Sequence, residues 1–229
     1  MKRFTLTVFG VLGLAGAAHA QGYNIDFGSA ATVPTAAYIA ASGQAGCWTR
    51  VNAGALTNLL TLGGCAATMD TISGTGIANG TFNHPNTITN HQRHMDDWVN
   101  LGAPGAVQTY TITLNSLMAP QWFAVWTYSW GSQPGVCSGV WVDVPGSIDP
   151  VVLVQDCGNW PAGIPGPAAY TLWQHFSYHE IQVLPGGVID IVLTVDGATP
   201  GNGRLNGIQL VPIAGPSNGG GVPPNYNPG

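Results

Sequence analysis

The sequence has very few charged side chains. Only 7% of its 229 residues are charged, with 5 basic against 10 acidic side chains, far below the usual quarter. Nucleic acids and anionic membranes are both bound through clustered Lys and Arg, so this composition argues against either partner. With so few charges, repulsion between charged side chains is also excluded as a cause of disorder in the body of the chain.

Long apolar runs are absent after the first twenty residues. Residues 1–20 contain Lys2 and Arg3, an apolar stretch, and a small-residue site ending at Ala20, which is the pattern of a secretory signal peptide. We expect cleavage after Ala20, leaving Gln21 at the start of an exported, non-lipidated chain. Without Lys2 and Arg3 its net charge is −7, and no segment is long enough for membrane insertion.

Helical periodicity is nearly absent as well, whereas turn residues are abundant, with 33 glycines and 17 prolines. Alternating or apolar segments predict strands at 23–28, 109–117, 121–130, 139–144, 150–156, 175–183, 187–195 and 204–212. One short helix is expected within 90–99, with Asn90 as its N-cap. Many short strands separated by turns predict an all-β fold, a single β-sandwich or jelly roll over residues 21–214. Residues 215–229, rich in Gly, Pro and Asn, are expected to be a flexible tail.

The chain has four cysteines and no C-x-x-C motif. An even number of cysteines in an exported chain predicts disulfides, and a zinc site is the weaker alternative. Three connectivities are possible. The spacing favours two local pairs, Cys47 with Cys65 and Cys137 with Cys157.

Short segments at both ends of the expected domain resemble a known family. "YNIDFGS" (23–29) and "GRLNGIQLVP" (203–212) are similar to the first and last strands of galactose-binding-like jelly rolls, including malectin-like domains and bacterial carbohydrate-binding modules. "HMDDWVNLG", "YTITLNSL" and "WFAVWTYSWG" resemble the acidic segment and central hairpin of small exported members. The resemblance implies a jelly-roll fold, binding rather than catalysis, and a structural calcium ion. The chain departs from malectin-like domains in its cysteine pairs and in "GCAATMDTISGTGIANGTFNHP" (64–85), which we interpret as an insertion.

Aromatic residues alternate along "QWFAVWTYSW" (121–130). In a strand, one side would carry Phe123 and Val125, and the other side would carry aromatic rings. If residues 139–144 pair with this strand, Trp141 lies on the same side as these aromatic rings. The predicted ligand-binding platform then consists of Trp126, Tyr128, Trp130 and Trp141. Such a platform would stack on sugar rings, whereas the alternative is that these rings form the sandwich interior.

Oxygen-bearing side chains supply candidates for the calcium site that the resemblance implies. The proposed ligands are Asp26, Asp96, Asp97 and Asp190. His91 and His94, three residues apart, would share one helical face and form a second possible metal site. A polar loop or short exposed helix is the alternative explanation of that pair. His175 and His179 are too far apart in a strand to share an ion.

Evidence for catalysis in the sequence is weak. A glycosidase needs two facing carboxyl groups, but Glu180 is the only glutamate, and no G-x-S-x-G motif occurs. We therefore expect no catalytic residues, and an exported, non-catalytic β-sandwich that binds a glycan or polysaccharide. The alternative is a structural surface or matrix protein that associates with itself, and a secreted hydrolase is the third possibility.

Overall fold

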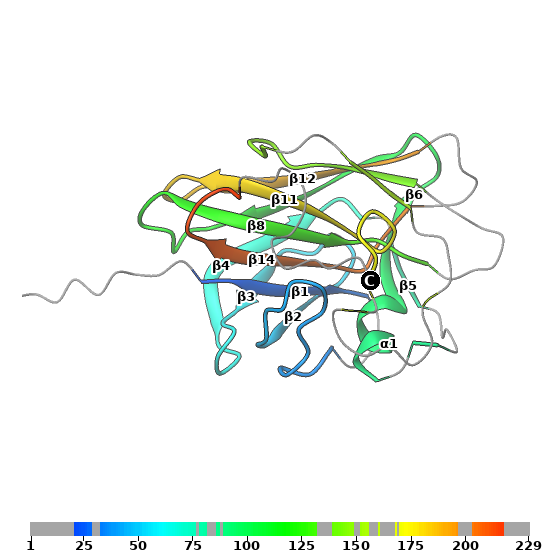
Figure 1. The fold of residues 1–229 in the computed structure, drawn as a ribbon, viewed down its shortest axis with the longest axis horizontal. Coiled ribbons are helices and arrows are strands. Elements are labelled where there is room, and N and C mark those ends of the chain that lie inside the picture. Colours follow the sequence, from blue (N-terminus) through cyan, green and yellow to red (C-terminus); the bar gives the residue numbers. More distant parts are fainter. Residues whose placement is uncertain are drawn as a thin grey trace, which may run out of the picture.

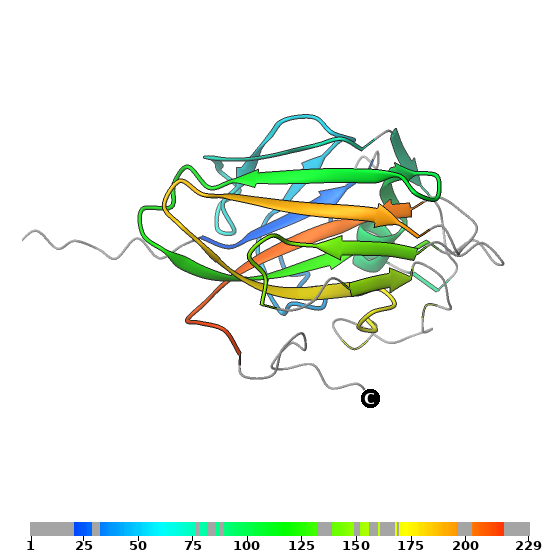
Figure 2. The ribbon, with the colours of Figure 1, turned by 90° about the horizontal axis from the view of Figure 1, so that it is seen from above.

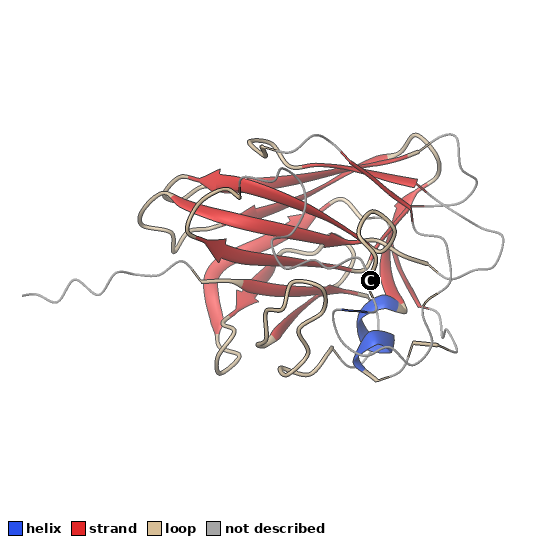
Figure 3. Cartoon of the chain, viewed as in Figure 1, coloured by secondary structure: helices blue, strands red, loops and turns tan. Residues whose placement is uncertain are grey.

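Two packed β-sheets form the body of the protein (Figures 1 and 3). The structure, a computed structural model, describes residues 21–28, 33–76, 78–81, 86–87, 89–131, 139–148, 152–155, 160, 168, 170–196 and 203–217. Its one described helix, α1 (Asn90–Met95), is short. No helix among the described residues has both the length and the apolar character needed to cross a membrane. The prediction of an all-β sandwich is confirmed.

The five-stranded sheet takes in strands from both ends of the chain. In spatial order it contains β11 (Phe176–Val183), β8 (Gln121–Tyr128), β14 (Gly207–Ile213), β1 (Tyr23–Phe27) and β2 (Trp48–Val51). Strands β1 and β2 run parallel, and the other neighbours are antiparallel. The two segments that resemble the ends of jelly-roll domains, in β1 and β14, are therefore direct partners.

The six-stranded sheet is antiparallel throughout. In spatial order it contains β10 (Val152–Gln155), β9 (Gly139–Asp143), β12 (Val188–Val195), β7 (Val107–Thr113), β4 (Ala67–Gly74) and β3 (Thr57–Leu60). A smaller sheet contains β13 (Gly203–Leu205), β6 (Asp97–Gly102) and β5 (Ala78–Thr81).

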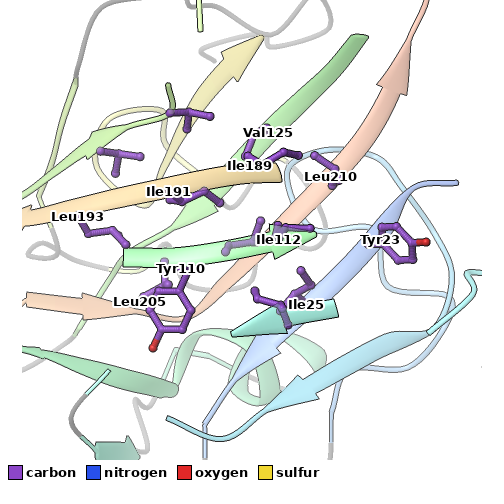
Figure 4. Close-up of a cluster of buried hydrophobic side chains, with 14 of the residues drawn as sticks. Tyr23, Ile25, Tyr110, Ile112, Val125, Ile189, Ile191, Leu193, Leu205 and Leu210 are labelled. Carbon is purple, nitrogen blue, oxygen red and sulfur yellow. The ribbon is translucent and has the colours of Figure 1, made fainter. Parts of the chain in front are cut away.

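Aliphatic side chains fill the space between the two large sheets (Figure 4). Strand alternation sends Ile189 and Ile191 of β12 inward from one side, and Ile25, Val125 and Leu210 inward from the other. All five are at most 1% exposed. The period-two pattern of the sequence thus fixes which side of each strand is core.

Strand pairing differs from the sequence-based expectation around residues 121–144. β9 does not pair with β8. It lies in the six-stranded sheet between β10 and β12, whereas β8 pairs with β11 and β14. Val140 and Val142 are fully buried in the core between the sheets. These valines face the five-stranded sheet across the core. β9 and β8 therefore lie in opposite sheets.

The segment interpreted as an insertion belongs to the body of the fold. It contributes β4, which pairs with β7 in the six-stranded sheet, and β5 of the small sheet.

The expected helix at 90–99 ends at Met95, because the chain enters β6 at Asp97. Thr89 occupies the N-cap position, and Asn90 instead bonds to Thr35 with its side chain.

Cys47 and Cys65 form a disulfide, as predicted. This bond joins the start of β2 to the turn before β4 and closes a local loop. Cys137 and Cys157 lie outside the described residues, so their pairing remains a prediction.

We predict that non-reducing peptide mapping will recover a peptide pair linking Cys137 to Cys157. Each closed loop of this size is expected to stabilise the fold by about 3 kcal/mol in the chain-entropy model. Free thiols at these two positions, or mixed disulfides with Cys47, would contradict the prediction.

Candidate functional site

The aromatic stretch of the sequence forms β8, whose side chains alternate between the two faces of its sheet. Phe123 and Val125 point into the core between the sheets, whereas Trp126 and Tyr128 point to the outer face. On that outer face, Trp126 stands in register with Tyr178 of β11. The predicted separation of the two sides of this strand is confirmed.

A second buried layer, the aromatic cluster, covers this outer face. Its members come from β2, β8 and β11 and from the segments packed over this sheet: Tyr38, Ala40, Trp48, Met95, Ala124, Trp126, Tyr128, Trp130, Trp160, Tyr170, Phe176 and Tyr178. Trp126 is 5% exposed, and Tyr128 and Trp130 are fully buried. The prediction that these three rings form an open platform with Trp141 is wrong, because chain segments cover them and Trp141 lies in the other sheet.

A hydrogen-bond network fixes the segment around residues 41–44 over the sheet. The Tyr128 hydroxyl donates to Gln209 Oε1 (2.5 Å) and accepts the Ala41 N–H (3.1 Å). The side-chain amides of Gln209 and Gln44 both donate to Asn24 Oδ1, at 2.7 and 2.8 Å. Buried polar groups are costly without such partners, so the network stabilises the covered arrangement of the outer face.

His94 and Asp26 form a buried pair inside the aromatic cluster. Their Nδ1 and Oδ1 atoms are 3.1 Å apart, and the Trp48 ring lies 4.8 Å from the imidazole. Burial raises the pKa of Asp26, with a further contribution from the charge of Asp97. Burial, and secondarily His91, lowers the pKa of His94 to about 3. Desolvation thus disfavours the charged form of each side chain of the pair.

This pair is isolated from solvent. His94 is 0% exposed and Asp26 is 2% exposed, and His94 Nε2 has no hydrogen-bond partner among the described residues. A histidine that transfers protons to a substrate must reach that substrate. The closed geometry therefore favours a structural role for the pair.

The proposed calcium ligands do not gather at one site. Asp26 contacts His94 and lies close enough to Asp97 for their charges to interact. Asp96 instead accepts the Thr87 hydroxyl with both oxygens, at 2.7 and 2.8 Å, and Asp190 belongs to the other large sheet. In the part of the chain that the structure describes, no three His, Cys, Asp or Glu side chains are grouped to hold a metal ion. His91 and His94 do share a helix face, but it is buried against aromatic rings. The predicted set of four ligands is therefore wrong as a group.

The outward side of the six-stranded sheet, here termed the hydroxyl face, differs in character from this buried layer; Figure 2 shows the strands of the sheet as ribbons. Its strands β4, β7 and β12 turn alternate residues inward, and the residues between them are partly exposed. The hydroxyl-bearing side chains on it are Thr71, Ser73, Thr109, Thr111, Thr113 and Thr194. Register places them in rows across the sheet, as with Ser73, Thr111 and Asp190. Hydrogen-bonding groups are thus repeated over a broad surface.

Trp141 is the large aromatic side chain of the hydroxyl face. It is 39% exposed, and in register it stands beside Thr194. Asp143, two residues along the same strand, points the same way and is exposed. A ring that can stack, next to hydroxyl and carboxyl oxygens, is a combination suited to a sugar.

Sequence reasoning identified Trp141 but not its neighbours on the hydroxyl face. The signal was present, because Thr109, Thr111 and Thr113 alternate with buried residues and Trp141 alternates with Asp143 in the same way. The local sequence does not show which strands pair with β9. Pairing β9 with β8 predicted that Trp141 lies beside Trp126, whereas β9 lies between β10 and β12.

Truncation of Trp126 tests the covered outer face. We predict that Trp126→Ala will lower the free energy of unfolding by about 3–5 kcal/mol, since a buried tryptophan is removed. Phe123→Ala, on the opposite face of the same strand, serves as the comparison and should cost a similar amount. Urea unfolding of both variants measures this. A loss below about 1 kcal/mol for Trp126→Ala alone would show that its face is open.

Acid sensitivity tests the burial of His175, which packs 4.8 Å from the Trp160 ring and accepts the Thr171 N–H at Nδ1 (2.9 Å). Burial lowers the pKa of His175 to about 3. Its uncharged form thus contributes stability that is present above pH 6.5 and is lost as the pH falls toward 3. From pH 7 to 5 we predict that the wild type loses about 2 kcal/mol more stability than His175→Asn. Parallel urea-unfolding profiles for the two proteins over this range would refute the assignment.

Comparison with known proteins shows similarity at the level of solved structures. No protein-family model and no curated protein matches the chain. A carbohydrate-binding module, CBM35 from Cellvibrio japonicus Abf62, is 15% identical, with 58% of this chain and 82% of that chain covered and a TM-score of 0.32. TmCBM61, solved with β-1,4-galactotriose, is 16% identical over 64% of this chain and 90% of that one, with a TM-score of 0.32.

A protein of another kind shows a likeness of the same strength. The mosquito-larvicidal Cry4Aa toxin from Bacillus thuringiensis is 14% identical, over 63% of this chain and 24% of that one, with a TM-score of 0.33. Carbohydrate-binding modules are thus among the solved structures that resemble part of this chain, each at low sequence identity and a TM-score of 0.32.

Proposed function

We propose that the protein is an exported, non-catalytic carbohydrate-binding β-sandwich whose ligand lies on the hydroxyl face. The observation that carries the proposal is Trp141, 39% exposed on an open sheet surface lined by threonine hydroxyls. Export follows from the signal-peptide pattern of residues 1–20.

Sugar recognition combines two kinds of contact that this face supplies. The apolar side of a pyranose ring stacks on an aromatic ring, and its hydroxyls exchange hydrogen bonds with polar side chains. Around Trp141 the nearest rows contain Thr194 and Thr109 as hydroxyl groups and Asp143 as an acceptor. Val107 and Val188 of this face are also exposed and add apolar surface.

The environment of the single glutamate supports binding without catalysis. Glu180 is 2% exposed, and its oxygens accept hydrogen bonds from the Tyr178 hydroxyl and from the Ser217 N–H. On the hydroxyl face, Asp190 accepts the Thr111 hydroxyl (2.6 Å) within a flat row of the sheet. Glycoside hydrolysis needs two carboxyl groups on opposite sides of a scissile bond, whereas Glu180 and Asp190 belong to different sheets.

A glycan array followed by titration of the best ligand tests the proposal. Trp141→Ala should weaken binding about fivefold or more, because a stacking ring is worth roughly 1 kcal/mol. Its unfolding free energy should change by less than about 1 kcal/mol, since the ring is partly exposed. Trp122→Ala, at a partly exposed tryptophan in the other sheet, is the matched control and should bind normally. Normal glycan binding by Trp141→Ala would overturn the proposal.

A further inference from the structure

The charges on the hydroxyl face are all of one sign. Asp143 and Asp190 are its acidic side chains, and none of its described residues is Lys, Arg or His. The arginines of the described chain lie elsewhere: Arg50 on β2, Arg93 on α1 and Arg204 on β13, where it stacks over Trp98. A ligand on this face therefore meets carboxylates without a compensating cation.

The hydroxyl face is also long. Along β7, outward residues run from Val107 to Thr113, about 20 Å at 3.3 Å per residue. Trp141 stands in the row of Val107, at one end, and Asp190 stands in the row of Thr111, toward the other. Contacts spread over this distance require several sugar units rather than one.

We propose that the hydroxyl face binds an uncharged polysaccharide, along internal sugar units of an extended chain. This inference rests on the proposed function and specifies its ligand class. One sugar stacks on Trp141, and the following units lie along the threonine rows of β7 and β12. Asp143 and Asp190 accept hydrogen bonds from sugar hydroxyls, and the same carboxylates repel uronate or sulfate groups.

The electrostatic argument follows from the placement of the two carboxylates. Asp143 is exposed and lies two residues from Trp141, so a group on the sugar stacked there comes close to it. A ligand carboxylate at such a distance is repelled, and repetition along an acidic polymer multiplies the effect. A neutral sugar hydroxyl instead forms a charge-assisted hydrogen bond with Asp143. The face thus discriminates by charge as well as by shape.

Matched polymers that differ in charge provide the test. Affinity electrophoresis at low ionic strength would compare hydroxyethylcellulose with carboxymethylcellulose, and methyl-esterified with de-esterified polygalacturonan, alongside galactan, xylan and mannan. We expect binding to at least one neutral polymer that is weakened about fivefold or more in Trp141→Ala, with charged counterparts bound about tenfold more weakly than the neutral polymer. The double variant Asp143→Asn/Asp190→Asn should narrow that gap severalfold, as should 1 M NaCl. Its amides preserve side-chain shape, and the amide oxygen introduced at position 190 can still accept the Thr111 hydroxyl.

The length of the ligand is tested with oligosaccharides from the best neutral polymer. A hexasaccharide should bind at least about tenfold more tightly than a disaccharide, because the contacts are spread along the strands. Equal affinity of the two, or binding of acidic polymers as tight as that of neutral ones, would overturn the inference while leaving Trp141-dependent sugar binding intact. If Trp141→Ala bound every polymer as the wild type does, the proposed function would fail and this inference with it.

Discussion

The burial of β8 on both faces is the constraint on which the rest of the structure depends. Its Phe123 and Val125 pack into the aliphatic core, and its Trp126 and Tyr128 pack into the aromatic cluster. A strand with two buried faces requires partners on both edges, which β11 and β14 supply, and a covering layer beyond its sheet. The chain segments over the outer face are therefore as much a part of the fold as the second sheet.

This covering layer explains why so many polar groups are buried without disrupting the fold. Asn24, Gln209 and Tyr128 are inaccessible, yet they bond to one another and to the segment above them. Such a network favours one arrangement of the covering segment, because every displaced member would leave an unsatisfied buried group. The His94–Asp26 pair follows the same rule, since burial disfavours the charged form of each side chain and the two are bonded to each other.

Much of this fold could be predicted from the sequence, because alternation is a local signal. The β7, β8 and β12 segments, and the inward sides of each, follow from a period of two. Segment 64–85 gives only weak alternation because it is rich in Gly and Thr, and its strand β4 is defined by its pairing with β7 and β3. Pairing itself is a long-range property, so Trp141 was placed beside Trp126 although the fold assigns it to the other sheet.

The candidate site was predictable only in part, for a related physical reason. Aromatic residues suit both a sugar-binding surface and a core, so residue type alone does not distinguish Trp126 from Trp141. The two tryptophans differ in what surrounds the outward side of their strands. A covering segment lies over β8, whereas the threonines in the sheet of β9 are partly exposed. Threonine favours strands and keeps a sheet surface polar, so the six-stranded sheet needs no cover. Because the aromatic side chains of the five-stranded sheet are buried, the proposed recognition surface is the other sheet, whose outward residues combine hydroxyls, two carboxylates and one exposed ring.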